Sequence, residues 1–136
     1  MKNELDRLLC ERYPELFTER SLPVEESAMG RGIECEDGWF DLIDSLCYTI
    51  QWWISNCEMP PVRIVQVKEK CGTLRFHFRG GNDVTRGMKA MAETMSASLC
   101  ETCGSPGKLR DELRYQQTLC DFHYQCRSTA APETSR

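Results

Sequence analysis

The stretches Cys100-Glu101-Thr102-Cys103-Gly104-Ser105-Pro106-Gly107 and Cys120-Asp121-Phe122-His123 decide how the C-terminal part of the chain folds. Each stretch carries two metal-ligating residues separated by two others, and sixteen residues lie between the second and the third ligand. Three thiolates and one imidazole at this spacing are the ligand set of a closed, tetrahedral zinc site. Because protein fills all four positions, no position remains for a reacting water. We therefore expect a structural Zn2+ bound by Cys100, Cys103, Cys120 and His123.

Cys100 and Cys103 could also form a thioredoxin-like redox pair, ligate an iron–sulfur cluster or be simple buried thiols. A redox pair usually follows a strand and begins a helix, whereas this pair follows a predicted helix and precedes a turn rich in glycine and proline. A cluster would need a fourth thiolate, which Cys126 could supply in place of His123 at a less suitable spacing. Buried thiols would leave the paired spacing unexplained. The zinc site accounts for the whole set, with Cys126 as the alternative fourth ligand.

The overall composition restricts the class of protein. The chain has 136 residues, of which 40% are hydrophobic, enough for one domain with a single core. Its net charge of −4 argues against non-specific electrostatic binding to nucleic acid or anionic lipid. Nine cysteines are an odd number, so they cannot all pair in one chain, and neither a signal peptide nor a membrane-spanning stretch is recognisable. We expect a cytoplasmic protein without membrane partners.

Apolar residues at helical spacing predict three helices before the zinc ligands. The first covers residues 3–13, and the second and strongest covers residues 38–56, with Asp37 as its N-cap. The third follows Asp83 and leads directly into Cys100. Its apolar stripe consists of Val84, Met88, Met91, Met95 and Leu99.

A β-hairpin is predicted between the second and third helices. Residues 62–68 and 73–79 are rich in β-branched and aromatic side chains, and Lys70-Cys71-Gly72 supplies the turn. The second strand alternates between apolar and polar residues, whereas the first does not and could be buried on both faces. Residues 21–38 form a long connecting loop that crosses the surface or meets a partner.

These elements predict an α+β fold in which amphipathic helices pack on a β-hairpin or small antiparallel sheet. Residues 1–99 form the core, and residues 100–126 form a zinc-knuckle lobe packed on it. Residues 127–136 form a disordered tail, since they are rich in Ser, Thr, Ala and Pro. The lobe has few apolar residues of its own, so metal binding is expected to supply much of its folding free energy.

The predicted hairpin is basic in an otherwise acidic chain. Residues 62–79 hold five Lys or Arg residues against one Glu, so the rest of the chain carries a net charge of −8. The candidate contacts with an anion or an acidic partner are Arg63, Lys68, Arg75, His77 and Arg79. The alternative, to which we give more weight, is an ordinary solvated strand face whose charges prevent edge pairing.

Four phrases occur in an order that resembles a family of small uncharacterised proteins of tailed phages, prophages and bacteria. They are Gly38-Trp39-Phe40-Asp41-Leu42-Ile43, Val67-Lys68-Glu69-Lys70-Cys71-Gly72-Thr73-Leu74-Arg75-Phe76, the Cys100–Gly107 stretch, and Thr118-Leu119-Cys120-Asp121-Phe122-His123. The resemblance covers about residues 32–124 and implies a phage-related, cytoplasmic setting with four zinc ligands. An aromatic residue is expected in that family where this chain has Cys71, which is therefore not a required thiol. The resemblance brings no catalytic residues with it.

These observations favour a small zinc-stabilised, non-catalytic binding protein of phage type. Its partner would be a host or phage protein, for example a host defence or regulatory factor that it inhibits or modulates in the host cytoplasm. One alternative is a nucleic-acid-binding accessory protein that uses the basic hairpin. Another is a small thiol-redox enzyme. The chain has only two histidines, one of them assigned to zinc, and no recognisable set of catalytic residues accompanies them.

Overall fold

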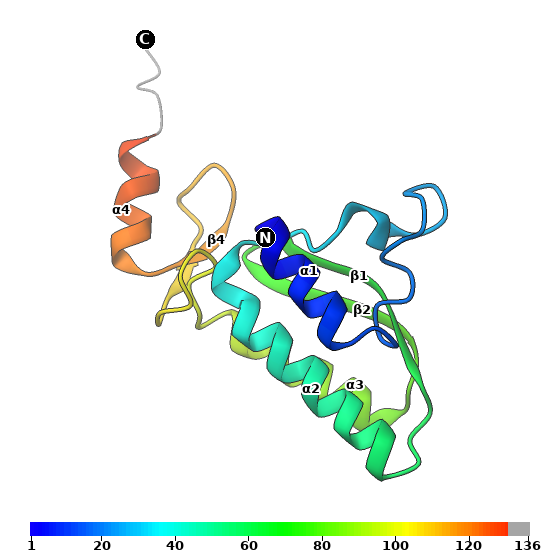
Figure 1. Ribbon diagram of the computed structural model, residues 1–136. Coiled ribbons are helices and arrows are strands. Elements are labelled where there is room, and N and C mark those ends of the chain that lie inside the picture. The colour runs from blue at the N-terminus through cyan, green and yellow to red at the C-terminus, as the bar shows by residue number, and fades with distance from the viewer. Residues whose placement is uncertain (131–136) are drawn as a thin grey trace.

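The computed structural model describes residues 1–130 and has an α+β fold with two small antiparallel sheets (Figure 1). Its elements in chain order are α1 (Asn3–Arg12), η1 (Ala28–Arg31), η2 (Asp37–Trp39), α2 (Phe40–Asn56), β1 (Val62–Lys70), β2 (Thr73–Gly80), α3 (Asp83–Ser96), β3 (Lys108–Arg110), β4 (Gln117–Leu119) and α4 (Asp121–Thr129). The predicted fold class is confirmed, including a Cys/His cluster near the C-terminal end.

The hairpin of β1 and β2 forms the centre of the fold. Cys71 and Gly72 both have positive φ, 52° and 81°, as a tight two-residue hairpin turn requires. The register shifts between Ile64 and Gln66, which marks a β-bulge at Val65. This bulge, rather than burial on both faces, explains the irregular pattern predicted for the first strand. It allows Ile64 and Val67 to be fully buried on the same face.

The inner face of the hairpin packs against the helices. Phe76 and Ile64 from the sheet and Ile43 from α2 are fully buried in one continuous apolar cluster. Helix α1 lies beside α2 (Figure 1), where the Tyr13 hydroxyl donates a 2.8 Å hydrogen bond to the Asp44 carboxylate. This cluster is the single core that the composition predicted.

The irregular segment before α2 covers the outer edge of β1. The Ile64 amide donates to the Leu16 carbonyl at 2.9 Å. Further along, the Glu34 amide donates to the Val67 carbonyl and the Glu34 carbonyl accepts from the Glu69 amide, each at 2.9 Å. The predicted loop 21–38 therefore contains an extended stretch that pairs with the sheet, which protects an otherwise open strand edge.

One local prediction is wrong, and the packing of α3 adds detail to another. Asp37 does not cap α2: Trp39 occupies the N-cap position, and the Asp37 carboxylate accepts from the Lys2 amide at 2.8 Å. In α3 the buried residues are Thr85, Ala92 and Ser96, whose small side chains allow close packing. Within the predicted apolar stripe, Met88 and Leu99 are partly buried against the core, whereas Met91 and Met95 are 66% and 45% exposed.

The C-terminal end departs from the predicted disordered tail. Helix α4 continues to Thr129, so residues 127–129 are its last turn, and Arg127 forms a 2.6 Å ion pair with Glu36. This contact with the core explains why the helix continues through a polar sequence. Residues 131–136 of the predicted tail lie outside the described residues.

Candidate metal centre

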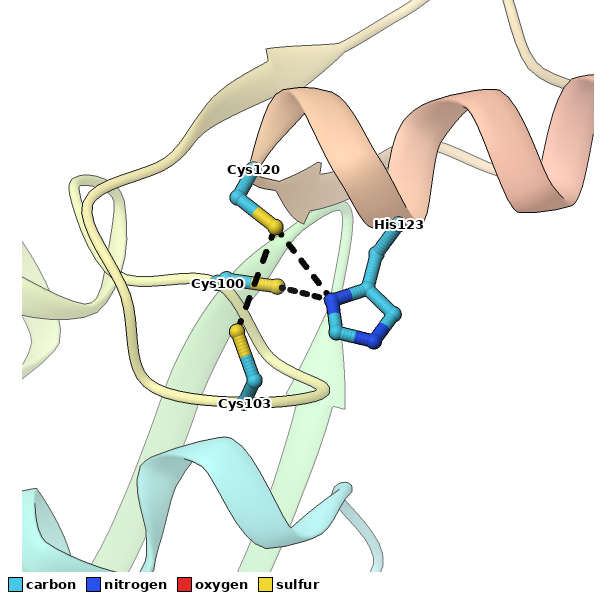
Figure 2. Close-up of side chains that lie close together, drawn as sticks. All are labelled: Cys100, Cys103, Cys120 and His123. Atoms are coloured by element: carbon cyan, nitrogen blue, oxygen red, sulfur yellow. Dashed lines mark hydrogen bonds between the residues drawn. The ribbon is translucent and has the colours of Figure 1, made fainter.

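The four residues of the predicted site come together from two segments (Figure 2). Cys100 and Cys103 lie on the loop that follows α3, whereas Cys120 and His123 lie at the start of α4. The ligand atoms all lie within 4.8 Å of one another. His123 Nδ1 is 3.2 Å from Cys120 Sγ and 3.6 Å from Cys100 Sγ. These atoms could bind one metal ion between them.

The loop between Cys100 and Cys103 folds back on itself as a metal-binding turn requires. The Gly104 amide donates to the Cys100 carbonyl at 2.8 Å, and Gly104 has a φ of 78° that favours glycine. The core residue Gly38 packs directly against this turn, and its amide donates to the Glu101 carbonyl at 2.7 Å. A Cβ on Gly38 would lie 2.2 Å from the Cys100 carbonyl oxygen. Gly38 is therefore a supporting residue that sequence analysis missed.

The second pair is positioned by β3, β4 and a buried arginine. The Arg110 side chain donates to the Leu119 carbonyl at 3.2 Å and to the Asp121 carboxylate at 2.6 Å. Its guanidinium also lies over the Tyr124 ring, 4.4 Å from the centroid. These contacts hold the end of β4 against the first turn of α4, which fixes the direction of the Cys120 side chain. The spacing of cysteines carries no signal for Arg110.

Cys100 and Cys103 differ in the pKa of their thiols. Burial raises the pKa of Cys100. Hydrogen bonds from the Ser105 side chain and then its backbone lower the pKa of the exposed Cys103 to about 6. The thiolate is the form that ligates metals, so the Ser105 contacts favour Cys103 as a ligand. Cys126 is exposed on α4 and is not in the cluster, so the fourth member of the group is His123.

Polar contacts join this centre to the core. The Trp39 indole donates to the Leu99 carbonyl at 2.9 Å, one residue before Cys100. Glu36 accepts hydrogen bonds from Thr102 and Arg127, both at 2.6 Å. Although burial acts to raise the pKa of Glu36, these two hydrogen bonds lower it overall. Glu36 thus connects the cysteine loop and α4 to the edge of the core, a role without a recognisable sequence motif.

Beside these contacts lies a buried acidic residue. Glu101 is 3% exposed, and one of its oxygens has no hydrogen-bond partner in the described part of the chain. The other oxygen accepts from the Glu36 amide at 3.2 Å. Burial raises the pKa of Glu101 to about 7, against the opposing effect of that hydrogen bond.

Four of the five predicted anion contacts form two cross-strand pairs on the outer face of the hairpin. Arg63 and Arg79 are cross-strand neighbours, and both form ion pairs with the buried Glu19, at 3.3 and 3.7 Å. Lys68 and Arg75 are also cross-strand neighbours, but neither forms an ion pair within residues 1–130.

His77 lies between the two pairs, opposite Gln66. Partial burial and then the positive charge of Lys89 lower its pKa, which disfavours a cationic role for this histidine. Of the four basic residues in the predicted set, Lys68 and Arg75 are therefore the two without an ion pair in residues 1–130.

Comparisons with models of protein families, with curated proteins and with solved structures find no match. Among the helices of residues 1–130, none combines the length and the apolar character needed to cross a lipid bilayer.

Proposed function

We propose that the four-residue cluster binds Zn2+ as a structural ion. The observation that supports this most directly is the convergence of three sulfurs and one imidazole nitrogen within 4.8 Å. This donor set suits zinc, because soft thiolates and imidazole in fourfold coordination are its usual ligands. Two ligands come from the loop after α3 and two from the start of α4, so the ion would cross-link these segments.

Metal content tests this proposal. The purified, reduced protein is expected to contain one zinc per chain by elemental analysis, and Cys120→Ser is expected to lose it. Cys126→Ser is the matched control, since Cys126 is an exposed thiol on the same helix outside the cluster. Loss of zinc in the control, or its absence from the wild-type protein, would contradict the assignment.

We further propose that the chain is a small, non-catalytic binding protein of phage type, which acts in the host cytoplasm on a host or phage protein. The resemblance described above supports the setting, and a ligand set with no position for water supports a passive metal. Affinity capture with the zinc-loaded protein tests the proposal. A stoichiometric partner is expected, and the Cys120→Ser protein is expected to retain less of it.

A second candidate function is binding of a polyanion such as nucleic acid to the hairpin. It is favoured by the unpaired, adjacent charges of Lys68 and Arg75, because like charges directly opposite each other on a sheet destabilise it. An anion between them would relieve this repulsion. Affinity for DNA or RNA should fall steeply with salt and be lost in Lys68→Gln/Arg75→Gln. Arg86→Gln, on exposed α3 surface, is the control. Binding that is insensitive to salt would exclude this function.

The thiol-redox alternative predicts that Cys100 and Cys103 react with alkylating reagents in the zinc-loaded protein. The structural-zinc proposal predicts protection of both thiols until a chelator removes the ion. Mass spectrometry of the alkylated protein separates the two.

A further inference from the structure

A groove on the side of the molecule between α2 and α3 is lined almost entirely by apolar side chains. Its volume is about 430 Å3, and its apolar walls are Leu42, Leu46, Met88, Met91, Met95 and Leu99. Met91 and Met95 are 66% and 45% exposed. Four members of the apolar stripe predicted on α3 line this groove, and two of them, Met88 and Leu99, also pack against the core.

Exposed apolar side chains continue beyond the groove along the same two helices. Six of the ten large hydrophobic side chains exposed in residues 1–130 lie on α2 or α3. On α2 they include Tyr48 and Trp52, which are 62% and 44% exposed. Large apolar side chains exposed together on two neighbouring helices are typical of an interaction site. Methionine is frequent where such a surface accommodates another protein, because its unbranched side chain adapts to different shapes.

The shape of this surface favours a convex occupant. A groove between two helices accepts the apolar ridge of a third helix, as in other helix-in-groove complexes. A second copy of this chain would place another α2, which has no Lys or Arg, against a groove that contains Asp41, so α2 would supply no opposite charge. The described residues therefore favour a partner helix over self-association.

The charges beside the groove specify that helix further. Asp41 is the one charged residue in the groove lining, and it forms no ion pair within the part of the chain that the structure describes. Its neighbours Asp37 and Asp44 are neutralised internally by Lys2 and Arg12. Helix α2 contains no Lys or Arg. An occupant with a basic residue at the Asp41 end would supply the missing counter-charge.

We propose that the α2–α3 groove binds an amphipathic helix of a partner protein, with its apolar ridge between Leu46 and Met91 and a Lys or Arg beside Asp41. This inference rests on the proposed function as a protein-binding protein and names the kind of segment that is bound. The four candidate metal ligands are not part of the groove lining, so substitutions in the groove leave the ligand set unchanged.

Synthetic helices test the inference with the full-length, zinc-loaded protein. The probe is a fluorescent peptide of about fourteen residues, roughly four turns, with Leu at positions i, i+3, i+4 and i+7, one Lys at the end that would lie beside Asp41, and Ala and Gln elsewhere. One comparison peptide has Glu in place of Lys, and another has the same composition with Leu at every second position. Saturable 1:1 binding is expected for the Lys helix, weaker binding for the Glu helix, and none for the alternating peptide.

Substitutions in the groove lining test where the Lys helix binds. Met91→Gln/Met95→Gln changes exposed side chains without changing charge and is expected to weaken binding of the Lys helix about tenfold or more. Asp41→Lys is expected to reverse the preference between the Lys and Glu helices. Tyr115→Gln is the control, because Tyr115 is 72% exposed, lies between β3 and β4, and is not part of the groove lining or of the metal cluster.

Three outcomes would overturn the inference. They are no binding of the Lys helix, binding that the methionine variant leaves unchanged, and a wild-type dimer in light scattering that the methionine variant dissociates. The last would assign the groove to a second copy. Zinc content and affinity capture stay unaffected by any of these results, so failure here is distinguishable from failure of the proposed function.

Discussion

The segment before Cys100 and the segment from Cys100 onward bury very different amounts of apolar side chain. Every residue of the main apolar cluster precedes Cys100. From Cys100 to residue 130, the buried hydrophobic residues are Cys100 itself and Leu119, while Leu109, Tyr115 and Phe122 are exposed. The core therefore has a hydrophobic driving force for folding, and the C-terminal lobe has little.

The lobe compensates with polar interactions that converge on a few atoms. Arg110 holds β4 to α4, Glu36 holds α4 to the core, and the Cys/His cluster joins the two halves of the lobe. Small metal-binding modules obtain about 10 kcal/mol or more from the ion. The contrast suggests that the part before Cys100 folds by apolar burial, and we expect the C-terminal lobe to depend on the proposed metal ion.

Metal removal is expected to have the largest effect, and to destabilise the C-terminal lobe while the core stays folded. With a chelator present under reducing conditions, amides in β4 and α4 are expected to lose protection in hydrogen exchange, because the proposed ion contributes about 10 kcal/mol to the lobe. Amides of β1, β2 and α2 should stay protected. Cys120→Ser should reproduce the effect and Cys126→Ser should not. Equal loss of protection throughout the chain would show that the core also depends on the metal.

Truncation in the core tests the other half of the comparison. Phe76 is fully buried, so Phe76→Ala is expected to destabilise the core by about 3 to 5 kcal/mol. All three tryptophans lie in residues 39–53, so their fluorescence reports the core during urea unfolding. Absorption of Co2+ bound in place of zinc reports the lobe. The fluorescence transition should move to lower urea in Phe76→Ala, whereas Tyr115→Ala, at an exposed position of the lobe, should leave it in place.

The core could be predicted from sequence because its signals are local. Helical spacing in residues 38–56 and alternation in residues 73–79 each reflect burial on one face, and both elements form as predicted. The errors occur where a second interaction decides the outcome. The bulge at Val65 shifts the register, and the small residues Thr85 and Ala92 allow close packing of α3 that a search for large apolar residues overlooks.

The candidate site was predictable for a different reason. Metal ligands obey a spacing set by coordination geometry, so the Cys/His group can be recognised without knowing the fold. Its supporting residues obey no such rule. Gly38 and Glu36 reach the site from distant positions in the sequence: Glu36 contacts Thr102 across 66 residues and Arg127 across 91. Each acts through a contact that exists only once the chain has folded.

The junction between core and lobe provides a pH-dependent test. Burial raises the pKa of Glu101 from its usual 4.5 to about 7, so the folded state binds this proton more tightly than the unfolded state. Stability from this group is fully present below pH 4.5 and is lost as the pH rises through 7. Glu101→Gln cannot ionise, so its stability relative to wild type should increase by about 1 kcal/mol between about pH 6 and pH 8.

Urea unfolding at the two pH values measures this difference. Glu25→Gln, at an exposed position in the segment before η1, controls for the change in net charge. A Glu101→Gln protein with the same pH dependence as wild type would show that the Glu101 carboxylate is solvated or paired in the folded protein.

A substitution on the exposed side of α3 should produce the smallest effect and separate the two regions most cleanly. A Cβ on Gly87 would meet no atom within 4 Å, so Gly87→Ala adds a methyl group without a clash. Because glycine is a poor helix former, this change should stabilise α3 by about 0.5 to 1 kcal/mol. If the core and the lobe unfold separately, tryptophan fluorescence will report the gain and Co2+ absorption will not. A shift of both signals by the same amount would mean that α3, which leads directly into Cys100, transmits its stability to the lobe and that the two regions unfold together.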